Sequence, residues 1–241
     1  MIRLLVFLAL SVCLAAESLT VEEIAAKYAA ARGGLEKMQA IKSLKLTGKM
    51  TMSAAQTEAP VTLFIKRPDR VRIEIQLGGN RLVQAFDGTT AWSINPNQGP
   101  APRPADQEEA LRTRETADFD GPLVNSKDKG IRLELLGQED VQGSPAYKIK
   151  AIRSNGRSEY HWVDARSFLE IKSSRRRPFM GREMEFEAFP ADYRPLQGVL
   201  LPASIEQRME GKPLLRIQWQ TMEANPALDE AVFRMPTGET R

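Results

Sequence analysis

The sequence predicts a mainly β fold with α-helices: one strongly curved antiparallel sheet, or incomplete β-barrel, of about ten or eleven strands with helices plugging its mouth. After Ser43, apolar and polar residues alternate with a period of two, which is typical of strands that have one dry face. Tight-turn sequences such as Gly78-Gly79-Asn80 separate these segments. With 42% hydrophobic and 27% charged residues, the composition is that of an ordinary globular protein.

The first 16 residues have the layout of a secretory signal peptide. Arg3 precedes an unbroken apolar run, Leu4 to Val12, and small residues follow up to Ala16. This apolar run is too short to remain as a membrane-spanning helix. We therefore expect a signal peptide over residues 1–16, a single domain over residues 17–241, and a periplasmic protein.

Cys13 leaves a less favoured alternative open. Leu10-Ser11-Val12-Cys13 is a weak lipobox, and a lipidated Cys13 would anchor the protein to a membrane. Val12 is bulkier than the glycine or alanine expected before a lipobox cysteine, which favours removal of Cys13 with the signal. The chain contains one cysteine, so the mature protein would then lack disulfides, cysteine-ligated metals and thiol catalysis.

A helix is predicted near the start of the mature chain. Thr20-Val21-Glu22-Glu23 fits a capping box, and Ile24 and Tyr28 fall on one helical face. Gly33-Gly34 ends this helix, and Leu35 to Ile41 adds a short second turn.

Strand-like alternation fills most of the remaining chain. Alternating segments, from which we expect about ten or eleven strands, lie at 43–52, 61–65, 71–77, 81–86, 91–95, 131–135, 147–150, 160–162, 169–171, 183–188, 205–209 and 215–220. The sequence contains no internal repeat and no clear linker, which favours one domain.

Two segments interrupt the sheet pattern. Residues 95–104 are rich in proline, which excludes a helix or a central strand. Ala105 to Asp118 predicts a polar helix whose main large apolar residue is Leu111. Because so polar a helix is weakly anchored, it is either a movable lid or a plain surface connector.

Catalytic and metal-binding patterns are poor. The single histidine, His161, lies between Tyr160 and Trp162, and we expect it on the wet face of a strand. The acidic residues at 183, 185 and 187 share one strand face and predict a solvated, salt-bridged surface. Phosphate-loop, EF-hand, dinucleotide and Gly-x-Ser-x-Gly patterns are missing from the sequence. We therefore expect no enzyme, no cofactor and no metal.

Charge argues against nucleic acid as a partner. The chain has 34 basic and 31 acidic residues, a net charge of +3, which is too balanced for such a role. Arg175-Arg176-Arg177 is the densest basic cluster. It could contact anionic headgroups or a partner, or form a solvated hairpin tip.

Two segments of the front half resemble a known family. Phe64-Ile65-Lys66-Arg67-Pro68-Asp69, and then residues 86–92 with Asn95-Pro96, resemble LolA-type periplasmic lipoprotein carriers. The opening helix and residues 225–236, with Phe233, resemble the broader outer-membrane lipoprotein-sorting group. The resemblance implies a half-open antiparallel barrel with a helical lid over an apolar cavity, which carries lipoprotein acyl chains across the periplasm. It also implies that Arg67 latches the lid by hydrogen bonds.

Two additions depart from the pattern of these carriers. Residues 175–181 and 191–202 make this chain longer than a typical carrier. Another cargo, or a lipid-sensing role, is therefore equally compatible with the resemblance.

The cavity implied by the resemblance would be lined by large apolar residues from the strands and the lid. We expect Leu46, Met50, Leu63, Ile65, Val71, Ile73, Ile75, Trp92, Ile94, Leu111, Trp162, Phe186 and Trp219 to form this lining. An apolar cavity accepts acyl chains without directional contacts, at about 0.8 kcal/mol for each buried methylene. On periodicity alone, the same residues could instead pack a solid core.

We therefore expect a non-enzymatic periplasmic carrier of lipoprotein acyl chains or other lipids, which delivers them toward the outer membrane. The alternatives are a lipid- or lipoprotein-sensing regulatory module, a hydrolase on a β scaffold that uses His161, and a structural lipoprotein anchored through Cys13. The expected partners are acylated lipoproteins or lipids and membrane-associated donor or acceptor proteins, with the protein itself a monomer.

Overall fold

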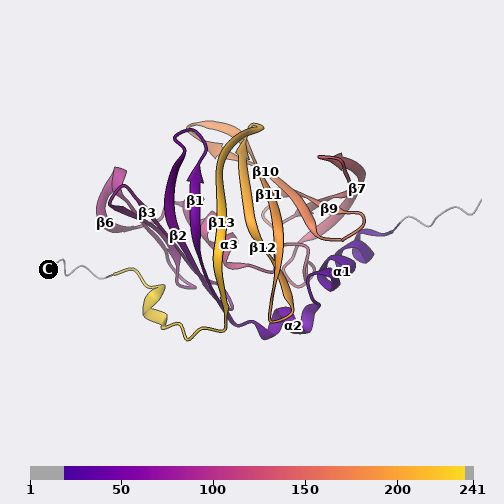
Figure 1. Cartoon of the computed structure of the whole chain (residues 1–241), viewed down its shortest axis with the longest axis horizontal. Helices are drawn as coiled ribbons and strands as arrows, with labels where there is room; N and C mark the ends of the chain where they lie inside the picture. The colour runs from indigo at the N-terminus through magenta and orange to yellow at the C-terminus, as the bar shows by residue number, and fades with distance from the viewer. Residues whose placement is uncertain (1–18, 237–241) are drawn as a thin grey trace, which may run out of the picture.

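A computed structural model describes residues 19–236, so the expected signal peptide over 1–16 and Cys13 lie outside the described part of the chain. The described residues form one sheet of 13 strands in the order β6-β5-β4-β3-β2-β1-β13-β12-β11-β10-β9-β8-β7. Every pairing is antiparallel. The strands β6 and β7 are the two edges and lie at opposite ends of the molecule (Figure 1). The sheet is therefore not closed, which confirms the predicted incomplete barrel.

The sheet has two halves that meet where the last strand pairs with the first. The first half contains β1 (Ser43–Met52), β2 (Thr57–Lys66), β3 (Arg70–Leu77), β4 (Asn80–Phe86), β5 (Ala91–Asn95) and β6 (Gly99–Pro104). The second half contains β7 (Arg132–Val141), β8 (Ser144–Ile152), β9 (Ser158–Asp164), β10 (Glu170–Phe179), β11 (Arg182–Leu196), β12 (Val199–Met209) and β13 (Lys212–Ala224). Pairing of β13 with β1 joins the two halves into one surface.

The strand count exceeds the expected ten or eleven, in part because of the proline-rich segment. In the proline-rich segment, which was expected to exclude a helix, Pro96–Gln98 form the short 3-10 helix η1. Gly99–Pro104 form the edge strand β6, where the missing proline N–H groups cost no ladder hydrogen bond. Residues 191–202, which looked like an addition, form the turn and the adjoining ends of β11 and β12, so they lengthen these two strands and do not add another.

Three α-helices lie among the described residues, in the predicted places. α1 (Val21–Ala31) begins with the predicted capping box, in which the Thr20 hydroxyl accepts from the Glu23 amide at 3.2 Å and the Glu23 carboxylate accepts from the Thr20 amide at 2.8 Å. α2 (Leu35–Ala40) follows the corner at Gly33, where a Cβ atom would lie 2.1 Å from the Gly198 carbonyl oxygen. α3 (Gln107–Ala117) is capped by Asp106. None of the helices in residues 19–236 is long and apolar enough to cross a bilayer.

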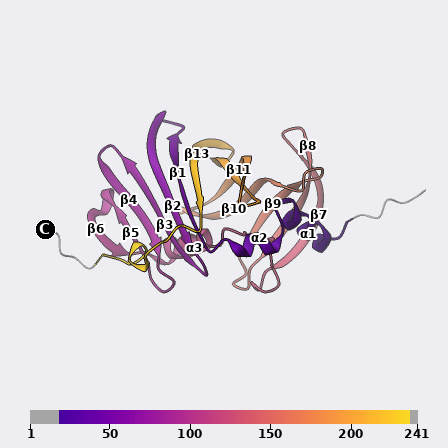
Figure 2. The ribbon, with the colours of Figure 1, turned by 60° about the horizontal axis from the view of Figure 1, so that its bottom comes forward.

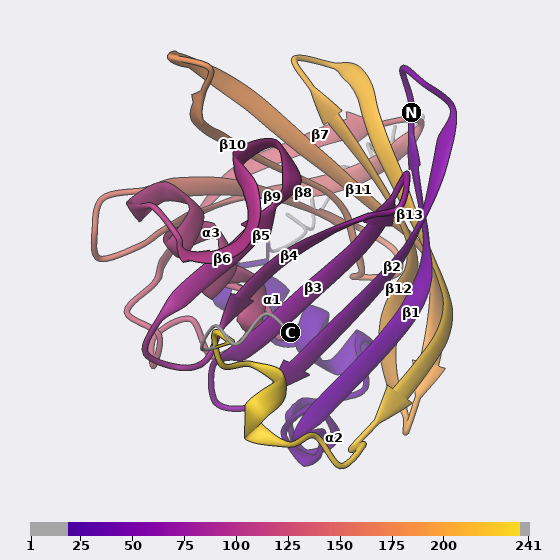
Figure 3. The same cartoon turned by 90° about the vertical axis from the view of Figure 1, so that its left-hand side faces the viewer.

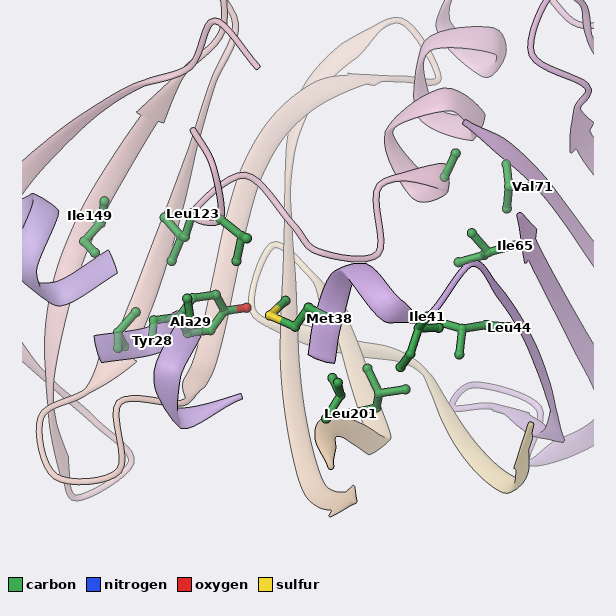
Figure 4. Packing of buried hydrophobic residues seen from close by; sticks show 14 of the residues in the cluster. Tyr28, Ala29, Met38, Ile41, Leu44, Ile65, Val71, Leu123, Ile149 and Leu201 are labelled. Atoms are coloured by element: carbon green, nitrogen blue, oxygen red, sulfur yellow. The ribbon is translucent and has the colours of Figure 1, made fainter. Parts of the chain in front are cut away.

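The inner face of the sheet carries the main core. In the first half, Leu63 pairs with Leu46 on one side and Ile73 on the other. In the second half, Ile149 pairs with Leu135 and His161, so these side chains also share a face. The helices α1 and α2 pack into this hollow, and their side chains lie between Ile149 at one side and Val71 at the other (Figure 4).

The outer face of the first half is covered by the C-terminal segment. The indole of Trp92 donates to the Phe233 carbonyl at 2.7 Å, and Arg72 donates to the Val232 carbonyl at 2.7 Å. The carboxylate of Glu230, in the 3-10 helix η2 (Glu230–Val232), pairs with Lys66 at 2.6 Å. This segment runs over the outside of the strands, as Figure 3 shows in yellow. The part of the first half around Trp92 is therefore buried on both faces.

Candidate functional site

An apolar pocket of about 240 Å³ lies on the inner face, where the two halves of the sheet meet. Its walls include Leu44, Leu46, Leu63, Ile65, Leu201 and Trp219, which come from β1, β2, β12 and β13. Figure 2 shows β1, β2 and β13 above α2 and α3, with α1 further to the right. The pocket lies just below the usual size range of small-molecule sites and well above the size of a single water molecule.

Residues 105–124, which contain α3 and the loop after it, cover the pocket, and we call them the roof segment. Thr116, Phe119 and Gly121 line the pocket from this segment. α3 itself lies against β3, β4 and β5, and Ala117 packs in the main core. The predicted polar helix is thus present and lies over apolar strands.

Arg67 ties the roof segment to α2. Its guanidinium forms a two-pronged ion pair with the Asp120 carboxylate, with both N–O distances at 2.7 Å. It also donates to the carbonyls of Ile41 at 2.9 Å and Met38 at 3.1 Å, and it stacks 4.2 Å from the Phe119 ring centroid. A planar guanidinium can satisfy all these partners at once. The backbone carbonyls that Arg67 holds belong to α2, whereas the roof segment contributes a carboxylate and an aromatic ring.

Arg32 binds the same loop and was missed in the sequence. It is only 4% exposed, and it donates to the carbonyls of Asp120 at 2.8 Å and Phe119 at 3.2 Å. The Tyr28 hydroxyl accepts from it at 3.1 Å. The one available signal was a charged residue directly before Gly33-Gly34, and such a residue is ordinary at a helix end. Two arginines, 35 positions apart in sequence, therefore converge on two consecutive residues of the roof segment.

Polar groups of the pocket gather at one corner. The Tyr193 hydroxyl donates to the Glu170 backbone carbonyl at 2.9 Å, and both residues line the pocket with Tyr28. Burial raises the pKa of both tyrosines, so their hydroxyls stay neutral. Apolar walls with a few fixed polar groups are typical of a site for a mainly apolar ligand.

His161 differs from its predicted place on a wet face. It is 4% exposed, and Nδ1 lies 2.5 Å from a carboxylate oxygen of Glu170. Burial would lower the pKa of His161, but Glu170 and then Glu159 outweigh it and raise the pKa. The register explains the reversed faces, because His161 pairs with the core residue Ile149.

The neighbour Trp162 takes the outer face in place of His161. It pairs with Lys148, and the ammonium groups of Lys148 and Lys172 lie 5.1 and 4.6 Å from its ring centroid. Its indole donates to Glu139 at 2.9 Å. Lysine side chains cover the ring there, so the burial of an aromatic residue does not by itself place it on the inner face.

The thirteen residues expected to line a cavity fall into distinct groups. Leu46, Leu63, Ile65 and Trp219 line the pocket. Met50, Val71, Ile73, Ile75 and Phe186 share the inner face but pack against neighbouring side chains instead. Leu111 is a half-buried residue of α3 and does not line the pocket.

Trp92 and Ile94 require a correction, as does Trp162. Trp92 pairs with Ala85 and Ile94 pairs with Val83, and these four form a separate cluster on the outer face. The C-terminal segment covers this cluster, so alternation in β5 could not reveal which face was inner. These three residues therefore do not line the pocket.

The described residues, 19–236, contain no group of three or more histidine, cysteine, aspartate or glutamate residues arranged to hold a metal ion.

Known structures with the same fold were found by comparison. An outer membrane lipoprotein-sorting protein domain from Vibrio parahaemolyticus matches with a TM-score of 0.60 at 13% identity, over 88% of this chain and 95% of that one. A DUF1329 family protein from Desulfovibrio piger matches with a TM-score of 0.59 at 11% identity, over 89% and 95% of the two chains. A LolA superfamily protein from Nitrosomonas europaea matches with a TM-score of 0.55 at 13% identity, over 90% and 98%.

Sequence comparison gives no such match: no family model and no curated protein matches the chain. The structural likeness covers almost the whole described chain at low identity. The chain therefore has the fold of the LolA-type lipoprotein-sorting proteins, as its sequence motifs predicted.

Proposed function

We propose that this protein is a non-enzymatic periplasmic carrier that binds the acyl chains of lipoproteins, or of other lipids, in the apolar pocket and delivers them toward the outer membrane. The observation that carries the proposal is the pocket itself, partly covered by a roof segment that two arginines and a few buried side chains hold in place. The shared fold with lipoprotein-sorting domains supports it.

The size of the pocket bears on what it can bind. A volume of about 240 Å³ corresponds to roughly eight water-sized groups. Burial of eight methylenes would contribute about 6 kcal/mol before the costs of ordering the chain. One acyl segment therefore fits the pocket as it stands, and a longer or second chain requires more room, which movement of the roof segment would supply.

The first test is retention of hydrocarbon by the purified protein. Native mass spectrometry of protein isolated from lipoprotein-rich cells should show additional mass that carries acyl chains. A homogeneous ligand-free mass, together with failure to bind an added fluorescent long-chain fatty acid, would contradict the proposal.

A second test asks whether the hydrocarbon binds in this pocket. Leu46→Gln puts an amide into the wall and should weaken fatty-acid binding by tenfold or more, since an unpaired polar group there costs about 1–3 kcal/mol. Ile94→Gln is the matched control, because Ile94 is 7% exposed and Leu46 is 6% exposed, but Ile94 faces outward. Equal losses of fatty-acid affinity in the two variants, measured where both are folded, would show that the hydrocarbon does not bind in this pocket.

A further inference from the structure

The apolar pocket borders a charged region on the same face of the sheet. Along β12, Ile205 lines the apolar pocket, and Gln207, two residues further, lines a polar pocket of about 160 Å³. Along α3, Thr116 lines the apolar pocket, and Glu115 lines another polar pocket of about 180 Å³. The apolar and polar pockets are therefore neighbours.

Arginines from three elements surround the polar pockets. Ser173 pairs with His161 on the inner face, so Arg175 and Arg177 follow on that face at alternate positions of β10. Arg153 and Arg157, from the turn between β8 and β9, line the larger polar pocket with Arg175. Arg112 of α3 is close enough to Arg177 to lower its pKa.

The carboxylates nearby do not balance this charge. Glu115 pairs with Arg175 at 2.9 Å and lies 3.7 Å from Arg153, which also pairs with Glu159 at 2.7 Å. Arg157 lies 3.6 Å from Glu108. Five guanidinium groups thus face three carboxylates, a formal excess of two positive charges, and Arg176 and Glu187, which also line the polar pockets, add one charge of each sign and leave this excess unchanged.

Arg177 is the arginine with the least compensation. No carboxylate of the described residues lies within 4.0 Å of it, and its nearest partner is the Phe186 ring, 3.6 Å away. Its Nε atom is buried without a hydrogen-bond partner in residues 19–236. Burial, followed by repulsion from Arg112 and Arg175, lowers the pKa of Arg177 to about 10. Arg177 is half-buried, and Glu108 offsets the repulsion from Arg112 and Arg175 only in part, so an anionic ligand would stabilise this guanidinium.

We propose that Arg157, Arg175 and Arg177 form an anion subsite that takes the phosphate of a phosphorylated amphiphile while its hydrocarbon lies in the apolar pocket. The proposal rests on the carrier function for its hydrocarbon half and on the arginines for its anionic half. Guanidinium groups bind phosphate oxygens by paired, charge-assisted hydrogen bonds, and the free Nε–H of Arg177 supplies one donor.

The test compares the affinities of the protein for two amphiphiles that have the same acyl chains. Dioctanoyl phosphatidic acid and dioctanoyl glycerol differ in the phosphate alone, and calorimetry below their micelle concentrations measures both affinities. The unmodified protein should bind the phosphatidic acid at least tenfold more tightly, because one or two charge-assisted hydrogen bonds are gained. Arg177→Gln should abolish most of this preference and leave binding of dioctanoyl glycerol unchanged.

Two further variants separate a specific site from general electrostatics. Arg216→Gln changes the net charge equally, but Arg216 pairs with Glu206 on the outer face, so the preference should stay intact. Arg177→Lys keeps the charge and should retain part of the preference. The thermal midpoint of Arg177→Gln should equal or exceed that of the unmodified protein, since an uncompensated cation is removed.

The outcomes distinguish the two proposals. An unchanged preference in Arg177→Gln, or an equal loss in Arg216→Gln, would overturn the anion subsite. If neither dioctanoyl glycerol nor the fluorescent fatty acid binds, the carrier proposal fails, and the subsite is then judged with glycerol phosphate alone. Binding of glycerol phosphate that depends on Arg177 would support the subsite, and absence of such binding would overturn it.

Discussion

At the scale of single residues, His161 lies between the apolar pocket and the charged region. Its Nδ1 contacts Glu170, which lines the apolar pocket, and its Nε2 lies 3.9 Å from Glu159, which lines both polar pockets. Burial would raise the pKa of Glu159, but His161 and then Arg153 outweigh it and lower the pKa. The pair of glutamates therefore favours the protonated imidazole.

Protonation of His161 predicts a pH dependence of stability. Because the folded pKa of His161 is raised, its stabilising contribution is complete below the unfolded pKa and is lost as pH rises through the folded pKa. Stability should thus fall as the pH rises above about 6.5, by about 1.4 kcal/mol for each unit of pKa difference. Chemical denaturation across this range measures it.

His161→Gln is the direct control for this pH dependence. The chain contains one histidine, so this substitution removes all imidazole titration, and the slope should become shallower. An unchanged slope would show that other groups cause it.

Single residues also show how far the sequence could lead. Arg67 was identified from the Lys-Arg-Pro motif, and it does contact the roof segment. Its partner Asp120 lies 53 positions away in the chain, and nothing local to Asp120 distinguishes it from other surface aspartates. A charge pair of long sequence separation leaves no periodic signal, so only the fold brings it into view.

At the scale of elements, the roof segment is fixed by two arginines at its C-terminal end. Arg67 holds the carboxylate of Asp120, and Arg32 holds the carbonyls of Phe119 and Asp120. Both arginines come from the frame formed by α1, α2 and β2. Release of these contacts would free the loop that lines the pocket.

Arg67→Leu should therefore loosen the roof segment. The Asp120 side chain is 8% exposed and would lose its counter-ion, at a cost of about 2 kcal/mol, less than for a fully buried pair because Arg67 is a quarter exposed. Hydrogen exchange over residues 105–124 should become faster by on the order of tenfold.

Arg70→Leu is the matched control for this experiment. Arg70 is similarly exposed, at 28% against 25% for Arg67, but it pairs with Glu230 of the C-terminal segment. Its loss should leave exchange of the roof segment unchanged. If hydrogen exchange of the roof segment is equal in Arg67→Leu and the unmodified protein, Arg67 does not hold this segment in place.

Elements were predicted well where a local rule applied and less well elsewhere. The capping box of α1 and the glycine pair after it gave the first helix nearly to the residue. The face of β5 could not be assigned, because Ala91, Trp92, Ser93 and Ile94 are all buried and alternation disappears. Packing against the distant C-terminal segment causes this, and strand periodicity does not contain that information.

At the scale of the whole molecule, the sheet separates two apolar regions with different roles. The inner region holds the pocket, and the outer region holds Trp92 beneath the C-terminal segment. Phe233 is fully buried there. The class and the openness of the sheet followed from the sequence, whereas the volume of the pocket did not, because it depends on how side chains from eight elements meet.

Phe233→Ala should lower stability without impairing ligand binding. Loss of a fully buried phenyl group costs about 3 kcal/mol or more, and the intrinsic fluorescence of Trp92 should shift toward that of a wetter indole. Fatty-acid affinity, measured where the variant is folded, should be unchanged. Met235→Ala, at a half-buried neighbour, should show a smaller change. Loss of affinity in folded Phe233→Ala would show that the two faces are coupled.

The placement of α3 has a consequence for how the pocket could be emptied. One side of this helix packs through Ala117 onto the oily strands, and the other side presents Glu108 and Glu115 to arginines across the hollow. An outward movement of α3 would expose the apolar side chains beneath it to water and would separate its glutamates from the arginines at the same time. Salts such as sulfate strengthen the apolar packing of α3, whereas any salt weakens its ion pairs with the arginines. Opening of the pocket by movement of α3 should therefore depend on the ionic strength and on the kind of salt.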